Sequence, residues 1–165
     1  MDTILFDLDG TLLPMNQEDF LDTYFKALRS RLEGAGYDAD LILNAINEGT
    51  RAMIQNDGKV TNEEVFMKVF KEKTGDSFSK RLIRVINKFY QKDFDVAKLN
   101  TKPTPYASKC VSMLKRKGYK LAVATNPVFP EIAISKRIEW AGLCQNDFDW
   151  ITTYENSFYT KPNLH

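Results

Sequence analysis

Two aspartates near the start of the chain, Asp7 and Asp9, have the residue type and spacing that most strongly indicate chemistry. They end an apolar run, and Gly10 after them lets the backbone turn away without a Cβ clash. If residues 4–9 form a strand, side chains two apart share a face, so both carboxylates point to one place. Two converging carboxylates repel each other unless a cation or a proton intervenes. The pair therefore predicts a metal site, and we expect Mg²⁺, which prefers oxygen ligands and keeps waters and a substrate phosphate in its shell.

Size and composition bound the possible partners. The 165 residues suffice for one domain with a real core and a small second lobe. A formal net charge of +1 provides no long-range field for nucleic acid or anionic lipid, so neither is expected as a partner. No apolar segment approaches the roughly 20 residues of a membrane span, and the start lacks a basic secretion signal. We expect a cytoplasmic protein in which Cys110 and Cys144 are buried thiols rather than a disulfide.

A long helical insert separates the first two predicted strands, at residues 4–9 and 120–125. Asn16 is a suitable N-cap for the first helix, and Thr61 with Glu64 forms a capping box for the third. Apolar residues recur at helical spacing after each start, so each helix has one face to bury. The expected helices cover residues 17–32, 38–53, 61–70 and 79–90.

Strands and helices alternate in the rest of the chain. A linker at 100–105 leads to a helix over 106–117, and a helix over 130–140 precedes a strand at 150–153. This alternation is typical of a parallel sheet with right-handed crossovers. The sequence therefore predicts an α/β fold, with a core of residues 1–14 and 96–165 and an inserted helical bundle of residues 15–95.

Three short motifs stand in order along the chain: DLDGT at 7–11, ATNP at 124–127 and KPN at 161–163. With a helical insert after the first motif, the chain resembles the haloacid dehalogenase-like superfamily, in the branch of small phosphatases with a helical cap. The resemblance covers essentially the whole chain. It implies a Rossmann-like parallel sheet core and a cap that closes over the site and selects the leaving group.

The resemblance also implies a role for each motif residue. Asp7 attacks phosphorus and forms an aspartyl phosphate. Asp9 protonates the leaving oxygen and then deprotonates the water that breaks this intermediate. The Thr125 hydroxyl, Asn126 and Lys161 hold phosphoryl oxygens. Mg²⁺ bridges the Asp7 carboxylate, the Asp9 backbone carbonyl and the phosphate.

The first motif has two competing interpretations. An Asp-x-Asp pair can cap the segment that follows it without any metal. A calcium loop of the EF-hand type would use Asp7, Asp9, Thr11 and Glu18 at its first, third, fifth and twelfth positions. Leu12 excludes that loop, because the position needs glycine for a sharp bend, and a strand rather than a helix precedes the motif.

The later motifs are weaker when each is taken alone. Thr125 is then a strand-end residue that bonds its own turn, and Lys161 a surface lysine. Their order behind the first motif favours the functional interpretation. A serine or cysteine hydrolase is not expected, because the sole histidine, His165, is the last residue and offers no internal base.

The leading hypothesis is a Mg²⁺-dependent phosphatase that acts on a small phosphorylated metabolite. One alternative is a sugar mutase that returns the phosphoryl group, and another is a phosphate-binding or regulatory protein without turnover. Dehalogenation is disfavoured because Asp9 is present and a halide needs no proton. Arg51 and Lys59 in the insert are either contacts for an anionic substrate or ordinary surface charges.

The family's fourth motif, an acidic pair some twenty or more residues after the lysine, is not part of this sequence. That pair completes the Mg²⁺ site, and its strand lies beside the first strand. We therefore expect weak Mg²⁺ binding, poor turnover and an uncovered strand edge at residues 4–6, or else a sequence that is part of a longer protein. An intact mass near 19.0 kDa would identify the shorter chain as the real molecule.

Overall fold

A three-stranded parallel sheet forms the base of the molecule. The computed structural model describes residues 2–163, without the side chains of 76–79, so His165 lies outside the described residues. The strands are β1 (Thr3–Phe6), β2 (Lys120–Val123) and β3 (Trp150–Ile151), in the order β1-β2-β3. Residues 3–6 pair in register with residues 120–123. The predicted α/β class with a parallel sheet is confirmed.

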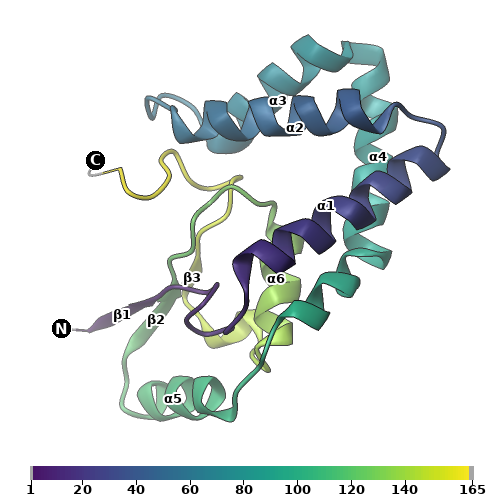
Figure 1. Ribbon diagram of the computed structural model, residues 1–165. Helices are drawn as coiled ribbons and strands as arrows, with labels where there is room; N and C mark the ends of the chain where they lie inside the picture. Colours follow the sequence, from purple (N-terminus) through teal and green to yellow (C-terminus); the bar gives the residue numbers. More distant parts are fainter. Residues whose placement is uncertain (1, 164–165) are drawn as a thin grey trace.

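Five helices, α1 to α5, and the 3₁₀ helix η1 lie between β1 and β2 in the sequence (Figure 1). Of these, α2 packs against α3, and α1 packs against α4 and the 3₁₀ helix η1. In Figure 1, α2 and α3 lie over the chain segment that follows β3. The division into a core and an inserted bundle at residues 15–95 stays a prediction. The elements outside the sheet are α1 (Gln17–Gly34), α2 (Ala39–Ile54), α3 (Asn62–Thr74), α4 (Asp76–Lys92), η1 (Phe94–Asn100), α5 (Pro105–Arg116), α6 (Glu131–Trp140) and η2 (Gln145–Asp147).

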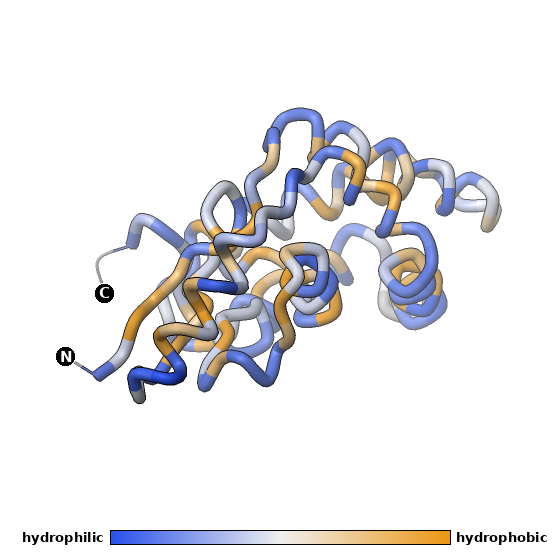
Figure 2. Tube along the Cα trace, turned by 90° about the horizontal axis from the view of Figure 1, so that it is seen from below, coloured by the Kyte–Doolittle hydropathy of each residue, from blue (hydrophilic) through white to orange (hydrophobic). Residues whose placement is uncertain are grey.

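The helix starts follow from their caps. Asn16 Oδ1 accepts hydrogen bonds from the backbone N–H groups of Glu18 and Asp19 at 3.0 and 3.3 Å. Thr61 and Glu64 form the predicted reciprocal capping box. Along the helices, Figure 2 shows the trace changing repeatedly between hydrophobic and hydrophilic residues. Local capping and one apolar face per helix therefore account for the helical region.

Two boundaries in this region differ from the prediction. The fourth helix begins at Asp76 rather than near residue 79, because Gly75, at a φ of 78°, turns the chain directly from α3 into α4. The segment before the linker forms η1, in which Phe94 and Ala97 are buried three residues apart. That spacing matches one turn of a 3₁₀ helix, so burial rather than propensity selects this conformation.

The strands are shorter than predicted, and this changes the argument for the first motif. Because β1 ends at Phe6, Asp7 and Asp9 lie beyond the strand, on either side of Leu8 where the chain begins to turn, and the prediction that they share a strand face is wrong. Backbone N–H groups inside the turn find carbonyl partners locally, as Leu13 N donates to Leu8 O at 2.9 Å. Gly10 has a φ of 82°, which a residue with a Cβ rarely adopts. The turn therefore aims the two carboxylates separately.

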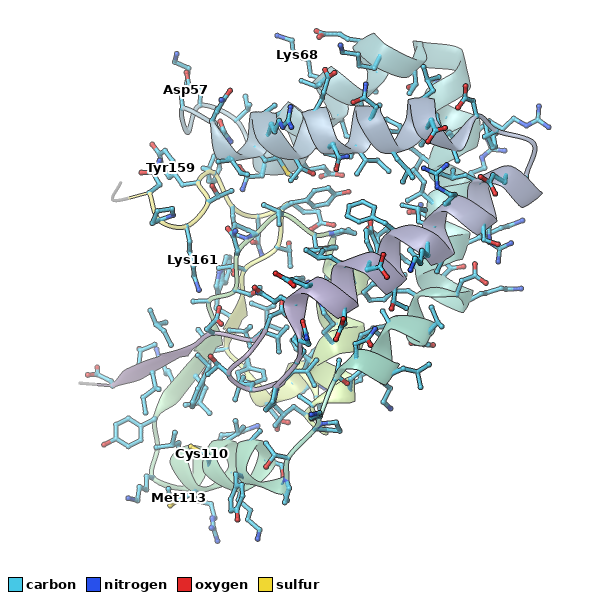
Figure 3. The ribbon with its side chains drawn as sticks, viewed as in Figure 1. Asp57, Lys68, Cys110, Met113, Tyr159 and Lys161 are labelled. Carbon is cyan, nitrogen blue, oxygen red and sulfur yellow. The ribbon has the colours of Figure 1, made fainter. Side chains whose placement is uncertain are left out.

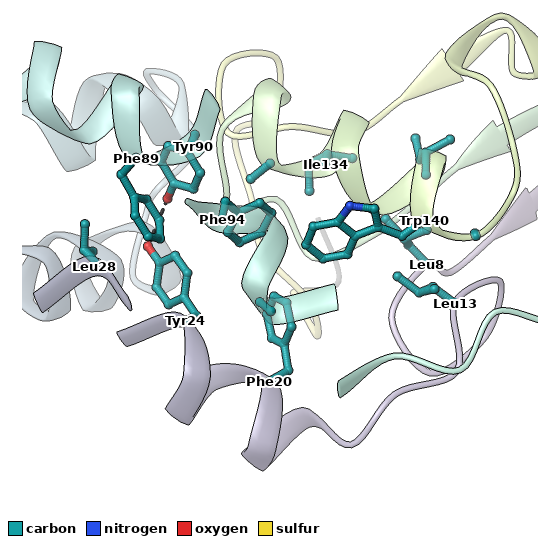
Figure 4. Close-up of a cluster of buried hydrophobic side chains, with 14 of the residues drawn as sticks. Leu8, Leu13, Phe20, Tyr24, Leu28, Phe89, Tyr90, Phe94, Ile134 and Trp140 are labelled. Atoms are coloured by element: carbon teal, nitrogen blue, oxygen red, sulfur yellow. Dashed lines mark hydrogen bonds between the residues drawn. The ribbon is translucent and has the colours of Figure 1, made fainter. Parts of the chain in front are cut away.

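A continuous apolar core joins the sheet to the helices. Figure 4 shows Leu8 and Leu13 of the first turn close to Trp140 of α6, and Phe20 and Phe94 further along the same core. Leu8 is fully buried, so the residue between the two aspartates anchors their turn. The core therefore holds the first motif in place.

The remaining predictions concern surfaces. Within the described sheet β1 is an edge strand, and Leu5 is 66% exposed, as expected for an uncovered edge. Cys110 and Cys144 are free, but Cys110 is only half-buried and Cys144 is exposed, so the prediction of two buried thiols is wrong. Cys144 directly precedes η2, outside any apolar helix face. None of the described helices has the length and apolar character needed to cross a membrane.

Candidate active site

The three strands end at the same edge of the sheet, and their following loops meet there. Asp7 directly follows β1, and Ala124 N, directly after β2, donates to Phe6 O at 2.7 Å. The next residue, Thr125, is buried, and its carbonyl oxygen accepts a hydrogen bond from the Thr152 hydroxyl at 2.8 Å. Ligands of open α/β sheets bind at this carboxyl edge.

Asp7 is held by a lysine that is 154 residues away in the sequence. Lys161 Nζ donates to Asp7 Oδ1 at 2.8 Å, and the Thr11 hydroxyl donates to the other carboxylate oxygen at 3.4 Å. The backbone N–H of Lys161 donates to Asn126 Oδ1 at 3.1 Å. Figure 3 shows the Lys161 side chain extending from the C-terminal segment toward the end of β1. Residues of all three predicted motifs thus come together.

The start of α3 fastens the loops that carry Lys161 and Asn126. The side-chain amide of Asn62, which is fully buried, donates to Pro127 O at 3.2 Å and to Tyr159 O at 3.4 Å. The next residue, Glu63, donates its backbone N–H to Tyr154 O at 2.8 Å. A helix of the insert therefore braces the loops at the strand ends.

Asp9 has a different partner, Arg137 of α6, which the sequence analysis did not identify. The Arg137 guanidinium donates to Asp9 Oδ2, with 1% of the arginine side chain and 18% of the aspartate side chain exposed. Arg137 also donates to Ala133 O at 3.2 Å and lies 4.5 Å from the centroid of the Phe129 ring. The sequence did hold a signal, because Arg137 lies at helical spacing on the face that contains Ala133, Ile134 and Ile138. An arginine on a buried helix face needs an anionic partner.

Burial raises the pKa of the Asp9 carboxyl group. Loss of water around the carboxylate raises its pKa, and this outweighs the lowering by the Arg137 charge; the Asp7 charge raises the pKa further. Asp9 Oδ1 is buried and has no hydrogen-bond partner among the described residues. A carboxyl group with a raised pKa and an unbonded oxygen is suited to hold and give up a proton.

A cavity of about 860 Å³ opens beside this site, and the sequence analysis did not predict it. Asp9, Asn126 and Arg137 line it, whereas Asp7 and Lys161 do not. Its other walls come from α1–α4 and from the loops after β2 and β3. The site thus has two sides: Asp7 and Lys161 outside the cavity, and Asp9 at its wall.

Comparison with known protein families shows to which of them the chain belongs. Residues 1–163 match the model of the haloacid dehalogenase-like hydrolases. The chain belongs to that family. This is the family that the sequence resemblance indicated.

Individual relatives of this hydrolase are distant. It is similar to a phosphoglycolate phosphatase of Aquifex aeolicus, with 33% identity over 129 residues, which cover 76% of this chain and 49% of the relative. The chain thus spans about half the length of that phosphatase. Among solved structures, it is similar to one named as a haloacid dehalogenase-like hydrolase from Bacteroides fragilis, with 22% identity, a TM-score of 0.45, and coverage of 98% of this chain and 67% of the other. Another, named as a beta-phosphoglucomutase from Thermotoga maritima, has 24% identity and a TM-score of 0.43, covering 94% of this chain and 62% of the other.

Members of this family typically use Mg²⁺, so the oxygen donors of this chain can be compared with what that ion needs. No group of three or more His, Cys, Asp or Glu side chains suited to a metal occurs among the described residues. Mg²⁺, however, is commonly held by one or two carboxylates together with waters and a substrate phosphate. The Asp7 carboxylate, 39% exposed, is an oxygen donor of that kind, and the Asp9 backbone carbonyl two residues later is a second oxygen donor. These residues fit the ion.

Proposed function

We propose that this protein is a Mg²⁺-dependent phosphatase that hydrolyses a small phosphorylated metabolite through an aspartyl-phosphate intermediate. The observation that carries the proposal is that two aspartates only two residues apart have different environments. Asp7 lies 2.8 Å from the ammonium of Lys161, while Asp9 is buried, has a raised pKa and faces a cavity. A nucleophile needs its charge and an acid needs its proton, so the two environments match the two roles.

In the first half-reaction, a carboxylate oxygen of Asp7 attacks phosphorus, and the bond from phosphorus to the leaving oxygen breaks. Asp9 transfers its proton to that oxygen, so the leaving group departs as an alcohol. Lys161 places a positive charge beside the phosphoryl oxygens, and Thr125 and Asn126 donate hydrogen bonds to them.

In the second half-reaction, Asp9 is a base. It removes a proton from water, whose oxygen bonds to phosphorus while the bond from phosphorus to Asp7 breaks. Phosphate leaves, and both aspartates regain their starting states. The Asp7 carboxylate and the Asp9 backbone carbonyl would hold Mg²⁺, which supplies neutralisation of the phosphate charge.

The decisive experiment is phosphate release from 4-nitrophenyl phosphate by the full-length protein, with and without Mg²⁺. We expect release that requires Mg²⁺ and that Asp7→Asn abolishes while the circular dichroism spectrum stays unchanged. Release by the Asp7→Asn variant at the wild-type rate would refute the proposed nucleophile. The same assay with Asp22→Asn, a substitution at an exposed position of α1, is the matched control.

The alternatives have their own outcomes in this experiment. A mutase would need a sugar acceptor for turnover, whereas the proposed phosphatase needs only water. A phosphate-binding protein without turnover would bind phosphate and release none from an ester. Either outcome would replace the proposed function.

A further inference from the structure

The cavity beside Asp9 has a composition that none of the proposed catalytic roles requires. Eight aromatic side chains line its 860 Å³. They come from both sides: Tyr24 of α1 packs against Phe129 of the loop after β2, with 5.6 Å between ring centroids. Phe66 of α3 lies 6.1 Å from Tyr154 of the loop after β3. Aromatic walls bind apolar and aromatic groups through burial and ring stacking.

The position of the cavity identifies which part of a substrate it would hold. Asp9 donates its proton to the leaving oxygen in the proposed reaction, so the leaving group lies on the Asp9 side. Asp9 lines the cavity, whereas Asp7 and Lys161, on the phosphate side, do not; of the proposed phosphate-binding residues only Asn126 reaches its wall. The aromatic walls therefore face the leaving group and not the phosphate.

The charges on the cavity wall are predominantly negative. Among the described residues, Arg137 is its only cation, and its side chain is 1% exposed and donates to Asp9, so it is not free to pair with a second anion. Four carboxyl side chains line it: Asp9, Glu63, Glu131 and Glu155. Burial and the neighbouring carboxylates raise the pKa of Glu63, as expected where no cation compensates it. A second anion on the leaving group would meet repulsion and no counterion.

The two cations of the insert that the sequence singled out do not change this balance. Neither Arg51 nor Lys59 lines the cavity. Lys59 forms an ion pair with Asp57 at 2.6 Å, and both side chains are mostly exposed. Of the two interpretations of Lys59, a surface charge is the one that this geometry supports.

We propose that the substrate is a phosphomonoester whose leaving group is aromatic and carries no second negative charge. This inference rests on the proposed function. Pockets of roughly 300–1,000 Å³ hold ligands of drug size, so a two-carbon leaving group such as glycolate would leave most of this cavity to water. Glycolate would also bring its carboxylate to a wall without a free cation. The substrate class thus differs from the one named for the Aquifex aeolicus relative.

Binding of non-hydrolysable phosphonates to the full-length protein with Mg²⁺ tests the inference independently of turnover. The probes are propylphosphonate, 3-phenylpropylphosphonate and 3-(4-carboxyphenyl)propylphosphonate, measured by isothermal titration calorimetry. We expect the phenyl compound to bind about tenfold or more tightly than propylphosphonate, because its ring is buried. Its carboxyl derivative should bind about tenfold more weakly than the phenyl compound.

Two asparagines of α2 provide a matched pair of variants. Asn47 and Asn44 are both exposed, but only Asn47 lines the cavity. Asn47→Lys should tighten binding of the carboxyl derivative about fivefold, as one new exposed ion pair allows, whereas Asn44→Lys should leave it unchanged. An equal gain in both variants would overturn the placement of the ring in this cavity.

The relative affinities of the three phosphonates test the substrate class, and the turnover assay tests the phosphatase function, so either can be contradicted without the other. Equal affinity for the propyl and phenyl compounds, or preference for the carboxyl derivative, overturns the inferred substrate class even if the protein is a phosphatase. If the affinities follow the expected order but no phosphate is released from the matching phosphate esters, the proposed function is wrong and the inferred ligand class is retained.

Discussion

Two ion pairs, formed by aspartates only two residues apart, occupy opposite environments. Lys161 and Asp7 are 50% and 39% exposed, and Arg137 and Asp9 are 1% and 18% exposed. A solvent-exposed pair costs little to separate, so its charges are available to a phosphate or a metal ion. A buried pair cannot be broken without leaving a charge in an apolar surrounding. The comparison indicates that the charges of the first pair are accessible to ligands, while the second pair fixes the orientation of the Asp9 carboxyl group.

The second pair also links the chemistry to the core. Arg137 lies on the buried face of α6 and against the Phe129 ring, so the direction of the Asp9 carboxylate depends on how α6 packs. Asp7 depends instead on the C-terminal segment that carries Lys161. Each aspartate is thus positioned by a different part of the chain, and the two parts can be perturbed independently.

The largest expected effect separates the roles of the two aspartates. Asp9→Asn removes the proton donor, so turnover of an alkyl phosphate should fall about 10²-fold to 10⁴-fold. Release of the leaving group should be slowed much less with 4-nitrophenyl phosphate, whose leaving group departs without a proton. Single-turnover kinetics of both esters measure this difference, because they separate the first half-reaction from the second, in which Asp9 is a base for either ester. Equal slowing of leaving-group release from both would argue against Asp9 as the acid.

Breaking the buried pair should mainly cost stability. Arg137→Met keeps the volume of the side chain but leaves Asp9 without its partner, and we expect the free energy of unfolding to fall by about 3–5 kcal/mol. Urea denaturation followed by circular dichroism measures the change. Arg137→Lys is the control, because it retains the charge and should retain part of the stability. A loss below about 1 kcal/mol in Arg137→Met would mean that the pair is not buried as described.

Breaking the exposed pair should reduce turnover and leave the free energy of unfolding almost unchanged. Lys161→Met should change the free energy of unfolding by less than about 1 kcal/mol, since the pair is open to solvent. Turnover should nevertheless fall about 10²-fold, because a positive charge beside the phosphoryl oxygens is lost. The contrast with Arg137→Met is the measurement of interest. A larger stability loss in Lys161→Met than in Arg137→Met would invert the comparison.

The smallest effect concerns a carboxylate that has other carboxylates as neighbours. Burial, and then the Glu155 and Glu64 charges, raise the pKa of Glu63 above its ordinary 4.5. The folded protein therefore holds this proton more tightly than the unfolded chain, so stability falls as the pH rises from about 4.5 through the folded pKa. Glu63→Gln should remove this loss. Its stability relative to the wild type should be higher at pH 7 than at pH 4, as urea denaturation at both values can show. A difference that is the same at both values would contradict the shift.

Much of the fold followed from local patterns. The caps at Asn16 and at Thr61 with Glu64 are those that the sequence predicted, because capping depends on residues within one turn of each other. The strand ends were predicted less well, since their lengths depend on where neighbouring strands stop pairing. That error changed the argument for Asp7 and Asp9 but not the choice of these residues.

The candidate site, too, could be predicted from the sequence only in part. The sequence by itself determined the residue types with chemical capacity, Asp7, Asp9, Thr125, Asn126 and Lys161, since motif order and spacing are properties of the chain. Only the tertiary structure decided the partner of each carboxylate and the character of the cavity wall. Arg137 reaches Asp9 across 128 positions, and the aromatic walls come from three helices and two loops. Burial and pairing over such separations arise from packing, which no local pattern encodes.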